Sequence, residues 1–304
     1  MTTRQTVVDT PRACLRPAAG PRGAARQPWW LWPHLLSLDA PVVALVWQDW
    51  WSRTAGVPLG VGERWVLGFG VWLIYLADRL ADVSRGGPED TGTARHAFTA
   101  AWRRPLWALA GLVAAGLVVL APKVLPVGEF RGGLGLLAAA GGYFWLIHRR
   151  PWPGWTRRVP KEAVVGGMFA LGTTFFALCR PPSAPGLLGA GVVLFGVVCF
   201  LNCALITAWE RNLRDRRDPV SLLNAFPRLV SHGLTHGCWL AAGLAVAVAG
   251  AWHALLPVPL ALAAVLLAGL HGGRRHLPAD VLRCLADAVL LTPCVCGVLA
   301  GVYQ

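Results

Sequence analysis

The chain has 304 residues, of which 55% are hydrophobic and only 14% are charged, and its mean hydropathy is +0.51. These values exclude an ordinary soluble domain and indicate an integral membrane protein. The net charge of +13 does not call for a nucleic-acid partner, because the basic residues lie in short segments between apolar runs, where anionic lipid attracts them.

Residues 1–28 are basic and lack the apolar stretch of a signal peptide, so we expect a disordered tail there. Residues 29–304 are expected to form one transmembrane domain. A helix crosses the bilayer core with roughly 17–25 mostly apolar residues. Runs of this kind occur at 33–52, 61–80, 105–122, 129–148, 162–180, 186–209, 236–255, 256–271 and 281–302. The sequence therefore predicts an all-α polytopic membrane protein, a bundle of about nine transmembrane helices.

Basic residues alternate in density from one inter-helix loop to the next. The N-terminal tail and the even-numbered loops, with their flanks, hold 23 of the 28 Lys and Arg residues. Since Lys and Arg accumulate in cytoplasmic loops, we expect a cytoplasmic N-terminus and a C-terminus outside. We further expect the protein in the inner (plasma) membrane of a bacterium.

Two groups of acids lie at the predicted cytoplasmic ends of the second and sixth spans. Asp78 and Asp82 are four residues apart and share a helix face. Asp215 and Asp218 are three apart and also share a face, and Glu210 precedes them. Hard carboxylate oxygens on one side of the membrane suit Mg²⁺, which takes one or two carboxylates together with substrate phosphates.

Basic side chains surround these acids, namely Arg95, Arg103, Arg104, Arg157, Arg158 and Lys161. Metal-binding acids next to phosphate-pairing bases predict a diphosphate site. The simpler alternative is that the acids only form surface ion pairs with neighbouring arginines. For either group alone that alternative is sufficient, and what favours a site is the presence of two groups on one side, since ionisable groups at membrane depth tend to be functional.

Three further acids lie inside predicted spans. Asp49 has Arg53 one turn after it and Asp287 has Arg283 one turn before it, so helix ion pairs account for both. Asp39 has no evident partner in the sequence.

The segments "IYLADRLAD" (74–82), "TARHAF" (93–98), "TRRVPKEAVVGGMFALG" (156–172) and "DRRDPVSLL" (215–223) together resemble the UbiA-like intramembrane prenyltransferases. Members of that family have nine transmembrane helices, an NDxxDxxxD motif at the cytoplasmic end of the second helix and a second Asp-rich motif after the sixth. Asp78 and Asp82 match the last two aspartates of the first motif, while Ile74 and Tyr75 replace its leading Asn-Asp.

The resemblance implies Mg²⁺-dependent transfer of a polyprenyl group from its diphosphate to a membrane-embedded aromatic or lipid acceptor. It implies that Asp78, Asp82, Asp215 and Asp218 hold the metal and act in catalysis. The substrate-binding residues that it implies are Arg79, Arg95, Arg158, Lys161, Asn202 and Glu210.

Two other functions remain open. The chain could be a catalytically degenerate protein that keeps the UbiA-like fold for a lipid-binding or structural role, because Ile74 and Tyr75 remove a potential metal ligand. A transporter is a more distant alternative, since the acids lie at helix ends and not at the mid-membrane depth typical of transporter sites.

Overall fold

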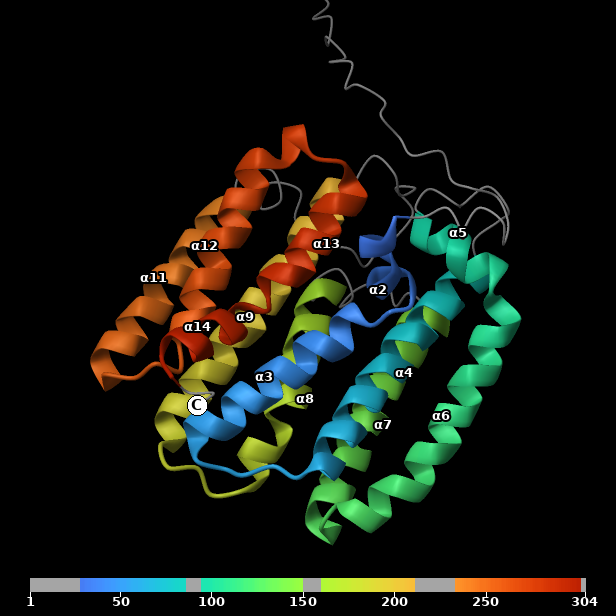
Figure 1. Cartoon of the computed structure of the whole chain (residues 1–304), viewed down its shortest axis with the longest axis horizontal. Coiled ribbons are helices and arrows are strands. Elements are labelled where there is room, and N and C mark those ends of the chain that lie inside the picture. Colours follow the sequence, from blue (N-terminus) through green and yellow to red (C-terminus); the bar gives the residue numbers. More distant parts are fainter. Residues whose placement is uncertain (1–27, 86–93, 150–159, 211–232, 302–304) are drawn as a thin grey trace, which may run out of the picture.

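The computed structural model describes residues 28–85, 94–149, 160–210 and 233–301, and every regular element in these ranges is a helix (Figure 1). The longer helices are α3 (Asp39–Ala55), α4 (Val61–Arg85), α6 (Arg103–Val124), α7 (Val127–Arg149), α8 (Lys161–Cys179), α9 (Pro185–Trp209), α11 (Leu234–Trp252) and α12 (Val258–Gly273). The shorter ones are η1 (Trp29–Leu31), α2 (Trp32–Leu35), α5 (Ala94–Ala101), η4 (Arg274–His276), α13 (Ala279–Val289) and α14 (Thr292–Leu299). The all-α prediction is confirmed for these ranges, and the predicted tail lies outside them apart from residue 28.

The predicted spans all coincide with a helix or with a bent pair of helices. Among the described residues, four helices are long and apolar enough to cross a membrane, and six segments qualify if each bent pair counts as one span. The four are α6, α8, α9 and α11, and the bent pairs are η1 and α2 with α3, and α13 with α14. These helices fit an integral membrane protein, while the count of nine crossings stays a prediction.

The first predicted span differs from the expectation of one straight helix. The chain bends by 80° between α2 and α3, and Ser37 in the bend takes a positive φ of 61°. The indole nitrogen of Trp72 on α4 donates to the carbonyl of Leu36 at 3.0 Å, which fixes the bend against α4. The bend turns the α2 segment across the end of the bundle, where it packs on α5.

Helix α9 lies in the middle of the bundle, in contact with α8, α11, α12 and α13. Its residue Phe195 packs on Trp47 of α3 with ring centroids 4.1 Å apart. Trp47 and Trp50 are fully buried and donate their indole N–H groups to the carbonyls of Leu290 and Leu256. Buried tryptophans with satisfied N–H groups make this a well-defined core.

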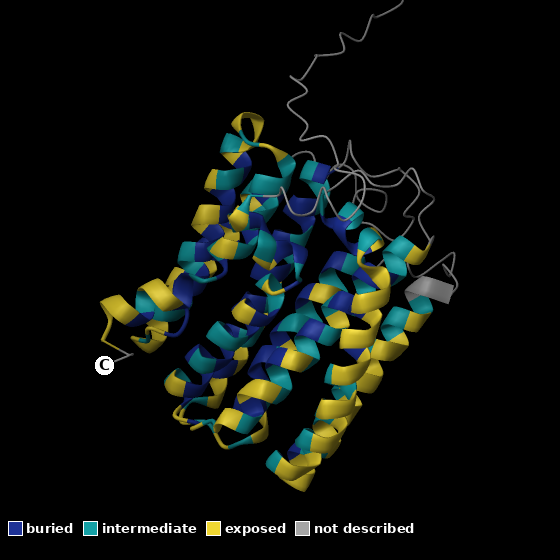
Figure 2. Cartoon of the chain, turned by 45° about the vertical axis from the view of Figure 1, so that its right-hand side comes forward, coloured by how far each residue is buried: buried dark blue, intermediate teal, exposed yellow. Residues whose placement is uncertain are grey.

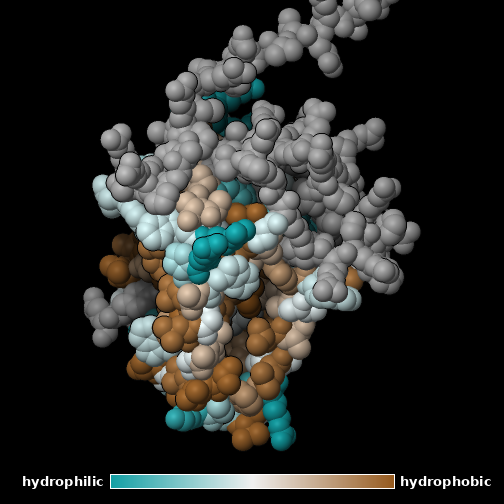
Figure 3. Space-filling model, turned by 90° about the vertical axis from the view of Figure 1, so that its right-hand side faces the viewer, coloured by the Kyte–Doolittle hydropathy of each residue, from teal (hydrophilic) through white to brown (hydrophobic). Residues whose placement is uncertain are grey.

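Apolar side chains cover the outside of the bundle as well as its inside. Helices α6 and α7 expose most of their residues (Figure 2), and hydrophobic side chains occupy the middle of the face seen in Figure 3. An exposed apolar surface of this size is typical of a protein whose sides face lipid.

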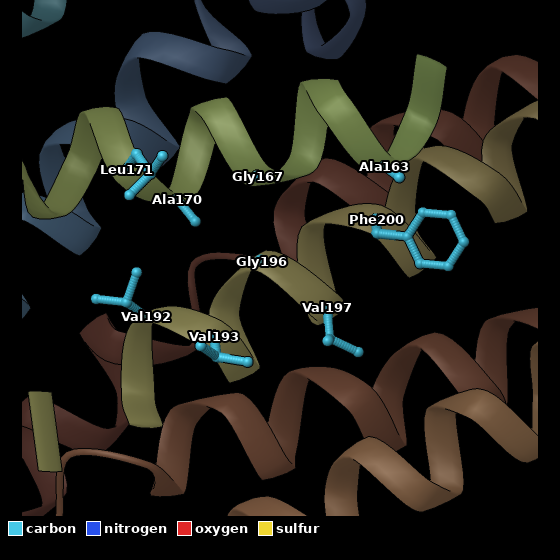
Figure 4. A pocket seen from close by; sticks show the side chains of 9 residues that line it. All are labelled: Ala163, Gly167, Ala170, Leu171, Val192, Val193, Gly196, Val197 and Phe200. Atoms are coloured by element: carbon cyan, nitrogen blue, oxygen red, sulfur yellow. The ribbon is translucent and has the colours of Figure 1, made fainter. Parts of the chain in front are cut away.

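Helices α8 and α9 approach each other closely at Gly166, where an added Cβ would lie 2.6 Å from the backbone nitrogen of Phe200. Beside this crossing the two helices enclose a groove with a volume of about 390 Å³, lined only by apolar residues such as Gly167, Ala170, Gly196 and Val197 (Figure 4). Because the groove contains no charged group, the chemistry expected of this chain lies elsewhere.

An ion-pair network joins three helices at the bundle end opposite α2. Arg180, which follows α8, donates from Nε to Glu129 of α7 at 2.6 Å and from Nη2 to Glu63 of α4 at 2.7 Å. Its Nη1 donates to the carbonyl of Pro58 at 2.7 Å. These hydrogen bonds, above all those to Glu129, raise the pKa of Arg180, so this residue remains a cation that holds the three helices together.

Candidate functional site

Asp78 and Asp82 lie in the last two turns of α4, and both are half-buried. Because α4 is helical through both residues, they lie on one face of it, one turn apart. Asp215, Asp218 and Arg158 lie outside the described residues, so the facing of the two aspartate pairs stays a prediction.

Arg79, the residue after Asp78 on α4, is buried, with 4% of its surface exposed. Its Nη1 donates to the backbone carbonyl of His34 on α2 at 2.5 Å. Its guanidinium carbon lies 4.5 Å from the centre of the Tyr75 ring, which is a cation–π contact. Arg79 therefore joins α4 to the α2 segment and points into the bundle.

Asp39 does have partners, and the sequence did not reveal them. Its Oδ2 lies 2.6 Å from Nδ1 of His34 and 3.6 Å from Nη2 of Arg79. Its Oδ1 accepts from the backbone N–H of Ala40 at 3.0 Å. The bend after α2 brings His34 back over the start of α3, next to Asp39. In a continuous helix, two side chains five residues apart would not meet in this way.

The predicted ion pair between Arg283 and Asp287 on α13 is replaced by two other contacts. Arg283 donates from Nη1 to Oε1 of Glu210, at the end of α9. Asp287 points to His34, with its Oδ2 3.8 Å from Nδ1. The corresponding prediction at the other end of α3 is confirmed, since Asp49 pairs with Arg53 at 2.6 Å and also with Arg64 at 2.9 Å.

Arg95, on α5, is 5% exposed, and no hydrogen bond or ion pair joins it to another described residue. Burial lowers the pKa of Arg95 to about 9, with further lowering by the cations of Arg283 and Arg79 and opposing effects from Tyr75 and Glu210. Arg95 is still charged at neutral pH. Three arginines from α4, α5 and α13 therefore lie within electrostatic reach of one another.

The remaining predicted residues lie along the same end of the bundle. Asn202 on α9 is buried, and its Oδ1 has no hydrogen-bond partner within the described ranges. Lys161 begins α8, next to Glu162, whose Oε1 accepts from the Thr207 hydroxyl at 3.1 Å. Cys203 on α9 lies within electrostatic range of Lys161 and Glu162 on α8 and of Arg283 and Asp287 on α13.

We use the term "polar cluster" for the buried and half-buried ionisable residues at this end, namely His34, Asp39, Tyr75, Arg79, Arg95, Glu210, Arg283 and Asp287. Of these, sequence reasoning had assigned Arg79, Arg95 and Glu210 to a site. It missed Arg283, His34, Asp39 and Asp287, whose only sequence signal is that each is a polar residue within a largely apolar span. A cluster with three guanidinium groups can bind an anion with several oxygens.

The chain matches no protein-family model, no curated protein and no solved structure at a significant level. The functional argument therefore rests on the polar cluster itself.

Proposed function

We propose that this chain is a divergent UbiA-like protein that binds a polyprenyl diphosphate at the polar cluster and transfers the polyprenyl group to an aromatic or lipid acceptor in the bilayer. The observation that carries the proposal is Arg95, a buried cation without an ionic partner among the described residues, close to Arg79 and Arg283.

The charges of the cluster are unevenly balanced. Arg283 is paired with Glu210, and Arg79 has Asp39 at 3.6 Å, but Arg95 has no corresponding acid in the described ranges. A buried unpaired charge is costly, and like charges nearby add to the cost. An anion between the arginines removes this cost, and a diphosphate offers enough oxygens to engage several guanidinium groups at once.

Mg²⁺ is the metal that the proposal implies, and the donor set agrees with it. Asp78 and Asp82 offer hard oxygen ligands one turn apart on α4, at the same end of α4 as Arg79. When bound there, Mg²⁺ would neutralise charge on the diphosphate.

The protein's own residues have three tasks in the proposed reaction. Arg79, Arg95 and Arg283 stabilise the negative charge that grows on the diphosphate as the bond between its oxygen and the allylic carbon breaks. The buried apolar side chains Leu76, Leu80 and Phe98, beside the cluster, exclude water that would otherwise capture the carbocation. The acceptor then forms the new bond to that carbon and releases a proton.

The alternative is a degenerate UbiA-like protein that binds lipid without turning it over. Ile74 and Tyr75 favour it, because Ile74 exposes 44% of its surface and Tyr75 packs against Arg79, so neither offers a carboxylate. Binding of an anionic isoprenoid is common to both functions, while product formation separates them.

The test is the binding of geranyl and farnesyl diphosphate to purified protein, with and without Mg²⁺. We expect wild type to bind, and Arg95→Gln to lose at least about tenfold in affinity, which corresponds to about 1.4 kcal/mol. Arg64→Gln is the matched control, because Arg64 pairs with Asp49 at the opposite end of the bundle. Equal affinity of Arg95→Gln and wild type, or no binding by wild type, would reject the proposed site.

A further inference from the structure

A second group of potential ligands lies within the polar cluster, and nothing above assigns it a ligand. Nδ1 of His34, a carboxylate oxygen of Asp39 and a carboxylate oxygen of Asp287 all lie within 4.8 Å of one another. They come from α2, α3 and α13, three segments that converge only in the folded chain. Within the described residues this is the one group of three or more His, Cys, Asp or Glu side chains close enough to hold a metal ion.

The hydrogen bonds inside this group are incomplete. Nδ1 of His34 can carry one proton, and it donates this proton in a hydrogen bond to Asp39 Oδ2 at 2.6 Å. Asp287 Oδ2, 3.8 Å from the same nitrogen, is sealed from solvent and has no hydrogen-bond partner among the described residues. A buried carboxylate oxygen without a partner is costly, so this oxygen needs a positively charged ligand or a proton of its own.

The surroundings hold the three side chains in place. Ala40 N–H donates to the second oxygen of Asp39. Arg79 donates to the carbonyl of His34, and Leu31 and Leu35, on either side of His34, are each 1% exposed. Hydrogen bonds and packing around the ligands are the support that metal sites require.

We propose that His34, Asp39 and Asp287 bind one divalent transition-metal ion such as Zn²⁺ or Mn²⁺. One imidazole nitrogen with two carboxylate oxygens suits these ions better than Mg²⁺, which prefers oxygen alone. Ligand atoms bound tetrahedrally at about 2.0 Å lie about 3.3 Å apart. The observed separations from His34 Nδ1, 2.6 Å to Asp39 and 3.8 Å to Asp287, lie on either side of that value.

The nearby arginines do not compete with this ion for the oxygen atoms of its ligands. Arg79 Nη2 lies 3.6 Å from Asp39 Oδ2, beyond hydrogen-bond distance, so the ion can take that oxygen without breaking a hydrogen bond to Arg79. Arg283 already has Glu210. Once the ion binds Asp39, Arg79 can interact with an anion instead. Only this link between the ion and Arg79 rests on the proposed diphosphate site.

The experiment uses the full-length protein in detergent, stripped of metal with a chelator. Zn²⁺ or Mn²⁺ is added, excess ion is removed, and bound metal per chain is measured by mass spectrometry. We expect one ion per wild-type chain, and at least about tenfold weaker binding in Asp287→Asn and Asp39→Asn. Asp49→Asn is the matched control on α3, because Asp49 is paired with Arg53 and Arg64 at the other end of that helix.

A second measurement uses only the wild-type protein, so it does not depend on whether a variant folds. X-ray absorption of the Zn²⁺-loaded wild type should show one imidazole nitrogen among oxygen ligands. No retained ion, an ion without imidazole, or equal retention by Asp287→Asn would each overturn the site. In the first case, an infrared band of a protonated carboxyl group that is lost in Asp287→Asn would identify a proton in place of the metal.

The two proposals fail in different ways. Metal counting is done without prenyl diphosphate, so an ion that binds while no diphosphate does would reject only the proposed function. Diphosphate binding that is unchanged by the removal of Zn²⁺ and Mn²⁺ would leave the arginine site intact, and would reject only the link through Arg79.

Discussion

Arg283 on α13 forms a buried ion pair with Glu210 at the end of α9, and the side chains of both residues are almost fully enclosed, with exposed fractions of 12% and 5%. The pair joins two helices that are separated along the chain by α11 and α12. It also lies beside Arg95 and Tyr75, so its geometry sets the shape of the polar cluster.

Removing one partner of this pair should destabilise the protein strongly. We expect Glu210→Gln to lower the free energy of unfolding by about 3–5 kcal/mol, because it leaves the Arg283 cation buried and unpaired. The double variant Glu210→Gln with Arg283→Met should recover part of that loss. Thermal unfolding in detergent measures both, and a double variant no more stable than Glu210→Gln would contradict the pairing.

The network around Arg180 should behave in the same way at the other end. Arg180→Gln leaves Glu63 and Glu129 as two neighbouring carboxylates without their shared cation. We expect a loss of about 1–3 kcal/mol, and a smaller loss, up to about 1 kcal/mol, for Arg53→Gln, whose partner Asp49 lies in a more exposed pair. Denaturation of the two variants side by side checks this. Equal losses in the free energy of unfolding would show that Arg180 does not hold the three helices together.

The α8–α9 crossing offers a matched pair of glycines. In Gly166→Ala the new Cβ would lie 2.6 Å from the Phe200 backbone nitrogen, so the helices must separate, at a cost of about 1–3 kcal/mol. In Gly167→Ala the new Cβ meets nothing within 4 Å, and the helix gains roughly 0.5–1 kcal/mol. Opposite shifts of the thermal midpoint are expected, and a neutral Gly166→Ala would mean that the crossing is looser than described.

The count of nine crossings predicts opposite sides for two points on the chain. A reporter fused after Gln304 should report the outside, and one inserted within residues 210–220 should report the cytoplasm. If both reporters lie on the same side of the membrane, the count of nine crossings is wrong, and the true number is lower or higher by one.

Helix positions follow from the sequence better than helix shapes do. The apolar run at 186–209 predicts α9, which spans Pro185–Trp209. The run at 61–80 predicts α4 but stops five residues early. Hydropathy ends where charged residues begin, while the backbone hydrogen bonds of α4 continue through Arg79 and Asp82. The bend at Ser37 was missed although Pro41 marks it, because Pro41 has no N–H to donate to the Ser37 carbonyl one turn earlier and prolines are tolerated within membrane helices.

The residues of the candidate site are harder to predict from the sequence than the helices are. The family resemblance implied Arg79 and Arg95 as substrate-binding residues, and both lie in the polar cluster, while their role stays a prediction. Arg283 could not be assigned from the sequence, because its partner Glu210 is 73 residues away and no periodic pattern links them. The local rule for residues one turn apart assigned Arg283 to Asp287, but the packing of α13 against α9 brings a different carboxylate closer.

The bend before α3 also affects how the protein fits its membrane. Because the straight part of this segment begins at Asp39 and ends at Ala55, its 17 residues span about 25 Å at 1.5 Å per residue. The hydrocarbon core of a typical bilayer is about 30 Å thick. Helix α3 is mostly buried by its neighbours, with only Val42 and Arg53 exposed, so its shortness falls inside the bundle and not against lipid. The bent α2 segment supplies the length that α3 lacks, since the two pass as a membrane span only together. The bend therefore sets the depth at which His34 and Asp39 lie below the end of the bundle.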